Sequence, residues 1–170
     1  RLSGRRPGPG DAVARWARPR CHVMAGMGGP VAFGPSPVGW TTMNVCPCGG
    51  VPAGASYEQC CGPALANDAW PETAEALMRS RYTAFALGAE DHLFRTWHPG
   101  TRPADTTVDP DTRWAGLQVD SVAAGGPEDE HGIVEFTAHH VTAGRPGSMH
   151  EISEFARRAG RWMYVGPAAC

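Results

Sequence analysis

The segment GIVEFTAHHV, residues 132–141, carries the side-chain alternation that decides the fold of this chain. Its apolar set is Val134, Phe136 and Ala138, and its polar set is Glu135, Thr137 and His139. In an extended chain, side chains two residues apart point to the same side, so the two sets lie on opposite faces. The pattern predicts a β-strand with one face in the core and one toward solvent.

Three further segments also have the pattern of a β-strand, so four strands are predicted in all. They cover residues 113–122, 132–141, 149–157 and 161–165. The turns between them contain Gly and Pro at 125–127, 144–147 and 159–160. Consecutive strands joined by short turns form an antiparallel meander. In the third strand, Glu151, Ser153 and Phe155 are expected to share one face.

The segment before the strands has the period of a helix. A helix is predicted over 73–87, with Thr73 as N-cap and Gly88 after its end. Its apolar face is Ala74, Leu77, Met78, Tyr82 and Phe85. A second helix over 89–97 is expected to bury Leu93, Phe94 and Trp97, with His98-Pro99 ending it. Helices followed by a meander predict an α+β domain with the helices on one sheet face.

Four cysteines lie ahead of the helices, and a short polar linker is expected after Gly62. Cys46, Cys48, Cys60 and Cys61 fall within sixteen residues of a Gly- and Pro-rich run. Four thiolates in tetrahedral arrangement are the ligand set of structural Zn²⁺. Two alternatives stay open: disulfides between the two pairs, and redox use of Cys60-Cys61, which requires an exposed thiolate of low pKa.

Residues 1–43 differ in composition from the rest. They contain fourteen Gly or Pro residues and show no apolar period, so they are expected to be disordered. No continuous apolar stretch follows their positive charges, so we expect no signal peptide, no membrane anchor and a cytoplasmic location. A translation start at Met43 is an alternative that would remove this extension.

Charge is divided unevenly along the chain. Residues 1–43 carry six Arg and one acidic residue, whereas residues 44–170 carry nine Arg and sixteen acidic residues. The second part therefore has a formal net charge of −7. Because phosphate binding needs clustered cations, nucleic acid is not expected as a partner of the folded part.

Several motifs, in order, resemble one known family. The run Cys46-Pro-Cys48-Gly49 with Tyr57-x-x-Cys60-Cys61-Gly62 is similar to the SEC-C zinc motif, named for the tail of the SecA translocase. Further motifs start at Leu77, Thr96, His150 and Gly160, and they resemble the bacterial YchJ-like proteins, a family of uncharacterised function. The resemblance implies a SEC-C-like motif at 44–63 and an NTF2-like domain at 70–166, with helices on a curved antiparallel sheet. The extension at 1–43 lies outside it.

NTF2-like domains can hold a pocket at the open end of the sheet, so residues expected there are candidate pocket residues. They are Tyr82, Trp97, His98, Glu151 and Ser153, with His150, Trp162 and Tyr164 as further members. Structural roles compete with this interpretation. Trp97 and Trp162 suit a core, His98 suits a helix end, and Glu151 could pair with Arg79 or Arg81.

Two classes of function remain. The first is a zinc-binding protein-interaction module, as the resemblance to the SecA tail implies. The second is a small-molecule binder or enzyme that uses the NTF2-like pocket, with zinc purely structural. No Ser-His-Asp order, phosphate loop or His-carboxylate metal triad is evident in the sequence, so no catalytic residue is predicted.

Overall fold

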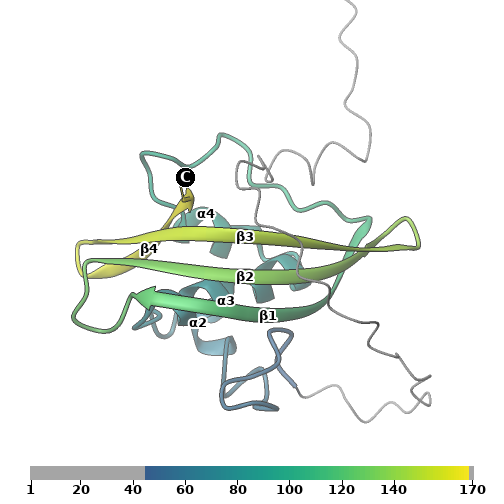
Figure 1. The fold of residues 1–170 in the computed structure, drawn as a ribbon, viewed down its shortest axis with the longest axis horizontal. Coiled ribbons are helices and arrows are strands. Elements are labelled where there is room, and N and C mark those ends of the chain that lie inside the picture. Colours follow the sequence, from purple (N-terminus) through teal and green to yellow (C-terminus); the bar gives the residue numbers. More distant parts are fainter. Residues whose placement is uncertain (1–44, 169–170) are drawn as a thin grey trace, which may run out of the picture.

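A four-stranded sheet forms one layer of the domain in the computed structural model, which describes residues 45–168. The strands are β1 (Thr112–Ala124), β2 (His131–Thr142), β3 (Arg145–Arg158) and β4 (Arg161–Pro167). They pair in the order β1-β2-β3-β4 and each pair is antiparallel (Figure 1). The predicted meander is confirmed, with strands that extend beyond the predicted ends.

The outer strand β1 is irregular at two points along its pairing with β2. The register shifts between Trp114 and Gly116 and again between Val119 and Ser121. One additional residue lies in β1 at each shift, Ala115 at the first and Asp120 at the second. Such bulges bend a strand and increase its twist.

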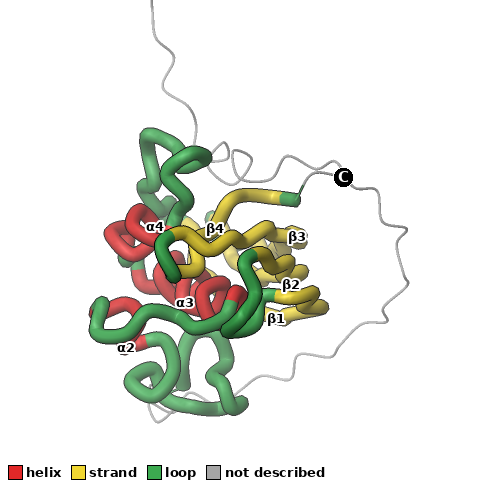
Figure 2. The backbone as a smooth tube through the Cα atoms, turned by 90° about the vertical axis from the view of Figure 1, so that its left-hand side faces the viewer, coloured by secondary structure: helices red, strands yellow, loops and turns green. Residues whose placement is uncertain are grey.

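In the described part of the chain, helices cover one face of the sheet, as Figure 2 shows. They are α2 (Gly62–Ala66), α3 (Ala74–Leu87) and α4 (Glu90–Thr96). The Thr73 side chain accepts a hydrogen bond from the N–H of Ala76, and Gly88 ends α3 in the left-handed conformation. Both predicted caps are therefore confirmed, as is the α+β fold with helices on one face of the sheet.

The expectation of a polar linker after Gly62 is wrong. Residues 62–66 form α2, and Asn67 ends it in the left-handed conformation. The segment is also attached to the domain, because Trp70 Nε1 donates to the carbonyl of Trp162 at 3.0 Å. At five residues, α2 is too short to produce a helical period in the sequence.

The start of α3 is packed closely against the hairpin of β1 and β2. The N–H of Ala74 donates to the carbonyl of Gly125 at 2.9 Å. A Cβ at Gly125 would lie 2.7 Å from the Cβ of Ala74, and its φ is +87°. Glycine is required there, because any side chain would both strain the backbone and push the helix off the sheet.

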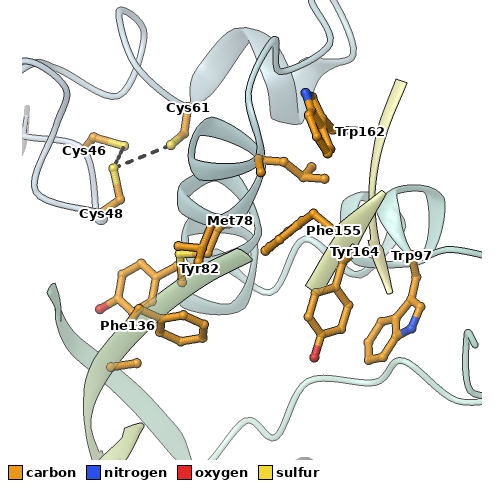
Figure 3. Packing of buried hydrophobic residues seen from close by; sticks show 14 residues of the cluster. Cys46, Cys48, Cys61, Met78, Tyr82, Trp97, Phe136, Phe155, Trp162 and Tyr164 are labelled. Atoms are coloured by element: carbon orange, nitrogen blue, oxygen red, sulfur yellow. Dashed lines mark hydrogen bonds between the residues drawn. The ribbon is translucent and has the colours of Figure 1, made fainter. Parts of the chain in front are cut away.

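The core lies between α3 and the sheet and continues into the cysteine loop (Figure 3). Leu77, Tyr82, Phe155 and Trp162 are buried in it. Phe94, expected in the core, is instead 47% exposed, and the guanidinium of Arg102 lies 3.6 Å from its ring centroid. The prediction failed because α4 contacts α3 and β4 through its other side, where His92 and Leu93 are buried.

The predicted disorder of residues 1–43 falls outside the described residues. Within residues 45–168, none of the helices combines the length and the apolar character that a bilayer crossing requires.

Candidate functional site

The sulfur atoms of the four clustered cysteines converge on one point. Cys48 Sγ lies 3.5 Å from Cys46, 3.6 Å from Cys60 and 3.7 Å from Cys61, and Cys60 Sγ lies 3.8 Å from Cys61. All four sulfurs are within 4.8 Å of one another. Each cysteine is a free thiol.

These distances fit a tetrahedral metal ion. Zn–S bonds of about 2.3 Å in a tetrahedron separate the sulfurs by about 3.8 Å. A disulfide would instead bring two sulfurs to about 2.0 Å and leave the pairs apart. The donor set therefore fits one soft or borderline metal ion held by four thiolates, and it does not support paired disulfides.

A tight loop brings the two cysteine pairs together. Val45 and Ser56 form an isolated antiparallel bridge, and the N–H of Cys46 donates to the carbonyl of Ala55 at 2.9 Å. Gly50 has a φ of +82°, and a Cβ there would lie 2.4 Å from the Ala55 nitrogen. Glycine at position 50 therefore allows the loop to close, because a side chain there would collide with Ala55.

Helix α3 contributes contacts to the cluster from outside the ligand set. The hydroxyl of Thr83, which is fully buried, lies 3.7 Å from Cys46 Sγ. Arg79 Nη1 donates to the carbonyl of Cys48 at 3.2 Å, and its Nε pairs with Glu75 at 2.7 Å. Such partners orient the ligands of a metal site.

The thiols of the cluster ionise unequally. A hydrogen bond from Cys61 lowers the pKa of Cys48 to about 5, and the same bond raises the pKa of Cys61. Burial raises the pKa of Cys60 to about 11. Redox use needs an exposed thiolate of low pKa, but Cys48 is only 1% exposed and the half-buried Cys60 is hard to ionise. The burial of these thiols therefore disfavours redox chemistry, whereas the sulfur–sulfur distances fit a metal ion.

A second feature is a cavity of about 90 Å³ between α3 and the sheet. Four of the predicted pocket residues line it, namely Tyr82, Trp97, Glu151 and Ser153, together with Tyr164. His98 is not in the lining. Its N–H donates to the carbonyl of Tyr164 at 2.7 Å, and its Nδ1 accepts from the N–H of Gly100 at 3.2 Å. His98 therefore stabilises the turn after α4. This agrees with a role at the helix end, the alternative to a role in the pocket.

The two other pocket candidates lie elsewhere. His150 is on the exposed side of β3, where its Nε2 is 3.0 Å from Glu135. Trp162 is fully buried, and its Nε1 donates to the carbonyl of Glu72 at 3.0 Å.

Glu151 is the buried carboxylate of the cavity. Its Oε1 accepts hydrogen bonds from the hydroxyls of Ser153 and Tyr164, the latter at 2.8 Å. Burial raises the pKa of Glu151, while these hydrogen bonds and the charge of Arg81 act in the opposite direction. Of the two arginines considered as partners of Glu151, Arg79 pairs instead with Glu75 at 2.7 Å.

Arg81 supplies the positive charge beside it. Its Nη1 donates to the carbonyl of Leu93 at 3.0 Å and to Thr96 Oγ1 at 2.9 Å. The guanidinium carbon lies 4.3 Å from the ring centroid of Tyr164 and 4.8 Å from that of Trp97. Burial lowers the pKa of Arg81 to about 10, so it remains a cation at neutral pH.

Together, these elements define an α+β domain with an NTF2-like arrangement that is preceded by a four-cysteine loop. A family model described as "YchJ, middle NTF2-like domain" matches residues 73–167. The chain belongs to this YchJ-like family.

Curated relatives carry the description UPF0225 protein. One from Chromobacterium violaceum is 50% identical over 124 residues, which cover 71% of this chain and 89% of that protein. Another from Streptomyces coelicolor is 48% identical over 120 residues, covering 71% of this chain and 91% of the relative.

Two solved structures share the fold. A SEC-C motif containing protein from Rhodopseudomonas palustris matches with a TM-score of 0.65 and 35% identity, over 74% of this chain and 98% of that one. A SEC-C motif containing protein from Psychrobacter arcticus matches with a TM-score of 0.61 and 27% identity, over 76% and 84%.

Proposed function

We propose that Cys46, Cys48, Cys60 and Cys61 bind one Zn²⁺ ion whose role is structural. The observation that carries the proposal is the set of sulfur–sulfur distances, 3.5 to 3.8 Å for the four nearest pairs. An all-thiolate tetrahedral site has no open position for a substrate, which favours a structural over a catalytic ion. The similarity to SEC-C motif containing proteins supports the same assignment.

Metal analysis of the purified chain tests this proposal. We expect one zinc per chain in the native protein and a large loss of zinc in Cys48→Ser. The matched control is Cys170→Ser, which removes a thiol far from the four-cysteine motif in sequence and is expected to keep one zinc. Native protein without stoichiometric metal, or with iron in place of zinc, would contradict the assignment.

The hydroxyl of Thr83 provides a finer test. Replacing an outer-shell partner of a metal ligand typically weakens metal affinity by about 10-fold or more. We therefore expect Thr83→Val to bind Zn²⁺ roughly tenfold more weakly, measured by competition with a chromophoric chelator. Thr83→Ser, which retains the hydroxyl, should bind as the native chain does. Equal affinity in all three chains would exclude a role for this hydroxyl.

We further propose that the metal-bearing loop docks a protein partner. A hollow of about 320 Å³ lies between this loop and the start of α3. Val51, Gln59 and Cys60 line one side of it, and Trp70, Ala76 and Arg79 line the other. Val51 is 54% exposed at its edge. A partner that inserts an apolar side chain fits this hollow, whereas the net charge of −7 over residues 44–170 disfavours nucleic acid.

Buried free thiols are suited to a reducing compartment such as the cytoplasm.

The docking proposal is tested with a pair of exposed valines. Val51→Asp places a charge at the hollow, and Val122→Asp places the same charge at the end of β1, where Val122 is 44% exposed. We expect one partner to be co-purified with the native chain and with Val122→Asp but lost with Val51→Asp, although all three chains retain zinc. Equal recovery with both variants would place the docking surface elsewhere.

A further inference from the structure

The cavity between α3 and the sheet combines an apolar wall with a cluster of polar side chains. The cluster contains Arg81, Glu151, Ser153 and Tyr164. Tyr164 joins its members, because its hydroxyl donates to Glu151 at 2.8 Å and its ring centroid lies 4.3 Å from the guanidinium carbon of Arg81. The apolar wall is formed by Met78, Phe85, Phe136, Ala138, Met149 and Phe155.

Glu151 keeps one carboxylate oxygen available in this cavity. Both of its hydrogen bonds, from Ser153 and from Tyr164, are made to Oε1. Its Oε2 has no hydrogen-bond partner in the described part of the chain and is not fully buried. Glu151 pairs with Phe136 across β2 and β3, so its side chain lies on the same sheet face as that core residue. The cavity it lines there is the space in which Oε2 can accept a hydrogen bond.

Arg81 offers hydrogen-bond donors to the same cavity. Its Nη1 is engaged with the carbonyl of Leu93 and with Thr96. Its Nε and Nη2 have no hydrogen-bond partner within residues 45–168, and they too are not fully buried. The ion pairs of this part of the chain include none between Arg81 and Glu151. Each of the two side chains can therefore bond to a group that lies between them.

The charges and hydrogen-bonding groups of the lining limit what this group can be. The charges of Arg81 and Glu151 offset each other, and Asp109 adds a second carboxylate, so an anion gains no net attraction. A hydroxyl group both donates and accepts, so it can satisfy Glu151 Oε2 and a guanidinium N–H at once. An ether can only accept, and a hydrocarbon can do neither. The apolar wall favours hydrocarbon for the rest of the molecule.

We propose that this cavity binds a small, neutral, mainly apolar molecule through one hydroxyl group, which donates to Glu151 Oε2 and accepts from Arg81. The inference depends neither on the metal nor on a protein partner. Helix α3 contributes Met78, Arg81 and Tyr82 to the cavity, whereas its contacts with the cysteine loop are made by Arg79 and Thr83.

Four aromatic probes of related shape separate the contributions. They are phenol, toluene, in which a methyl group replaces the hydroxyl, anisole, which only accepts, and benzoate, which is an anion. The readout is the methyl signals of Met78 and Met149 in the zinc-loaded full chain with ¹³C-labelled methionine, assigned by Met78→Leu and Met149→Leu. A ring bound in the cavity shifts both signals. Met163, which is buried but does not line the cavity, is the internal control.

We expect saturable shifts with phenol, weaker binding of toluene and anisole, and no binding of benzoate. In Glu151→Gln the side chain keeps its shape and an oxygen for Ser153 and Tyr164, but a nitrogen replaces the available oxygen. The affinity for phenol should therefore fall roughly tenfold, the effect of one hydrogen bond to a charged group, while that for toluene stays the same.

The matched control is Glu135→Gln. Glu135 lies on the other face of the sheet, where it contacts Ser121 and His150, so this chain should bind phenol as the native one does. If Glu151→Gln does not fold, the probe series on the native chain still decides. The proposal is overturned if the Met78 and Met149 signals do not respond to phenol, if any other probe binds as tightly as phenol, or if folded Glu151→Gln keeps the native affinity for phenol.

Discussion

Removal of the metal ion by a strong chelator is expected to unfold residues 45–62 first and to lower the melting temperature of the whole chain. The loop has little regular secondary structure, so we expect the free energy of metal binding, on the order of 10 kcal/mol in small structural sites, to be what folds it. Because Cys46, Cys48 and Cys61 belong to the buried core, unfolding of the loop also uncovers one side of α3. Thermal unfolding and hydrogen exchange, with and without chelator, measure the two effects.

The Cys48→Ser chain is the control for this experiment. It should melt at the lower temperature from the start and show no further change with chelator. Native protein whose melting temperature and loop protection are unaffected by complete metal removal would rule out a structural ion.

Acidification is expected to destabilise the fold through His92, although this residue is not one of the candidate site residues. His92 is 1% exposed. Its Nδ1 accepts from Arg95 Nη2 at 2.9 Å, so its Nε2 carries the proton and donates to Ser80 Oγ at 2.9 Å. Burial, assisted by the charges of Arg95 and Arg81, lowers the pKa of His92 to about 3 from 6.5.

The direction of the effect follows from where the proton binds. Below pH 6.5 the unfolded chain protonates this histidine and the folded chain does not. The free energy of unfolding therefore falls as pH drops from 6.5 toward 3, by about 1.4 kcal/mol per unit, and is independent of His92 at higher pH. Between pH 6.5 and 5 the expected loss is about 2 kcal/mol.

Comparison with His92→Gln isolates this contribution, because acid release of the metal affects both chains equally. Denaturant unfolding at a series of pH values should give two curves that approach each other as pH falls. Parallel curves between pH 7 and 4 would mean that His92 is protonated in the folded state.

The strands and the first long helix could be predicted because their signals are local. The alternation of Val134, Phe136 and Ala138 defines one face of β2, and the structure buries all three. The caps Thr73 and Gly88 similarly mark both ends of α3. Such patterns involve residues that are close in sequence, so they can be recognised without knowledge of the tertiary contacts of the element.

The other side of α3 could not be predicted. Ser80, Arg81 and Thr83 lie outside the apolar face predicted for this helix, yet each is buried. Each has a partner from a segment distant in sequence, namely His92, Leu93 and Cys46 respectively. Buried polar groups of this kind are determined by tertiary contacts, which a helical period does not reveal.

The two candidate sites also differ in whether their residues are close in sequence or are brought together by tertiary contacts. The four cysteines are close in sequence, and their spacing alone predicted that their sulfurs would meet. The cavity instead draws on α3, the loop at 107–109 and all four strands. Five of the candidate pocket residues line it, namely Tyr82, Trp97, Glu151, Ser153 and Tyr164, whereas other lining residues such as Trp114 lie within a predicted strand and carry no local sign of a cavity.

The irregular outer strand has a consequence for how copies of this protein behave at high concentration. A straight, regular edge offers a row of free N–H and C=O groups onto which a strand of another molecule can add. In β1 the extra residues Ala115 and Asp120 interrupt that row at two places, and Asp120 adds an exposed negative charge. The bulges therefore protect the sheet from growing between molecules, which keeps a fold with an open strand edge from aggregating.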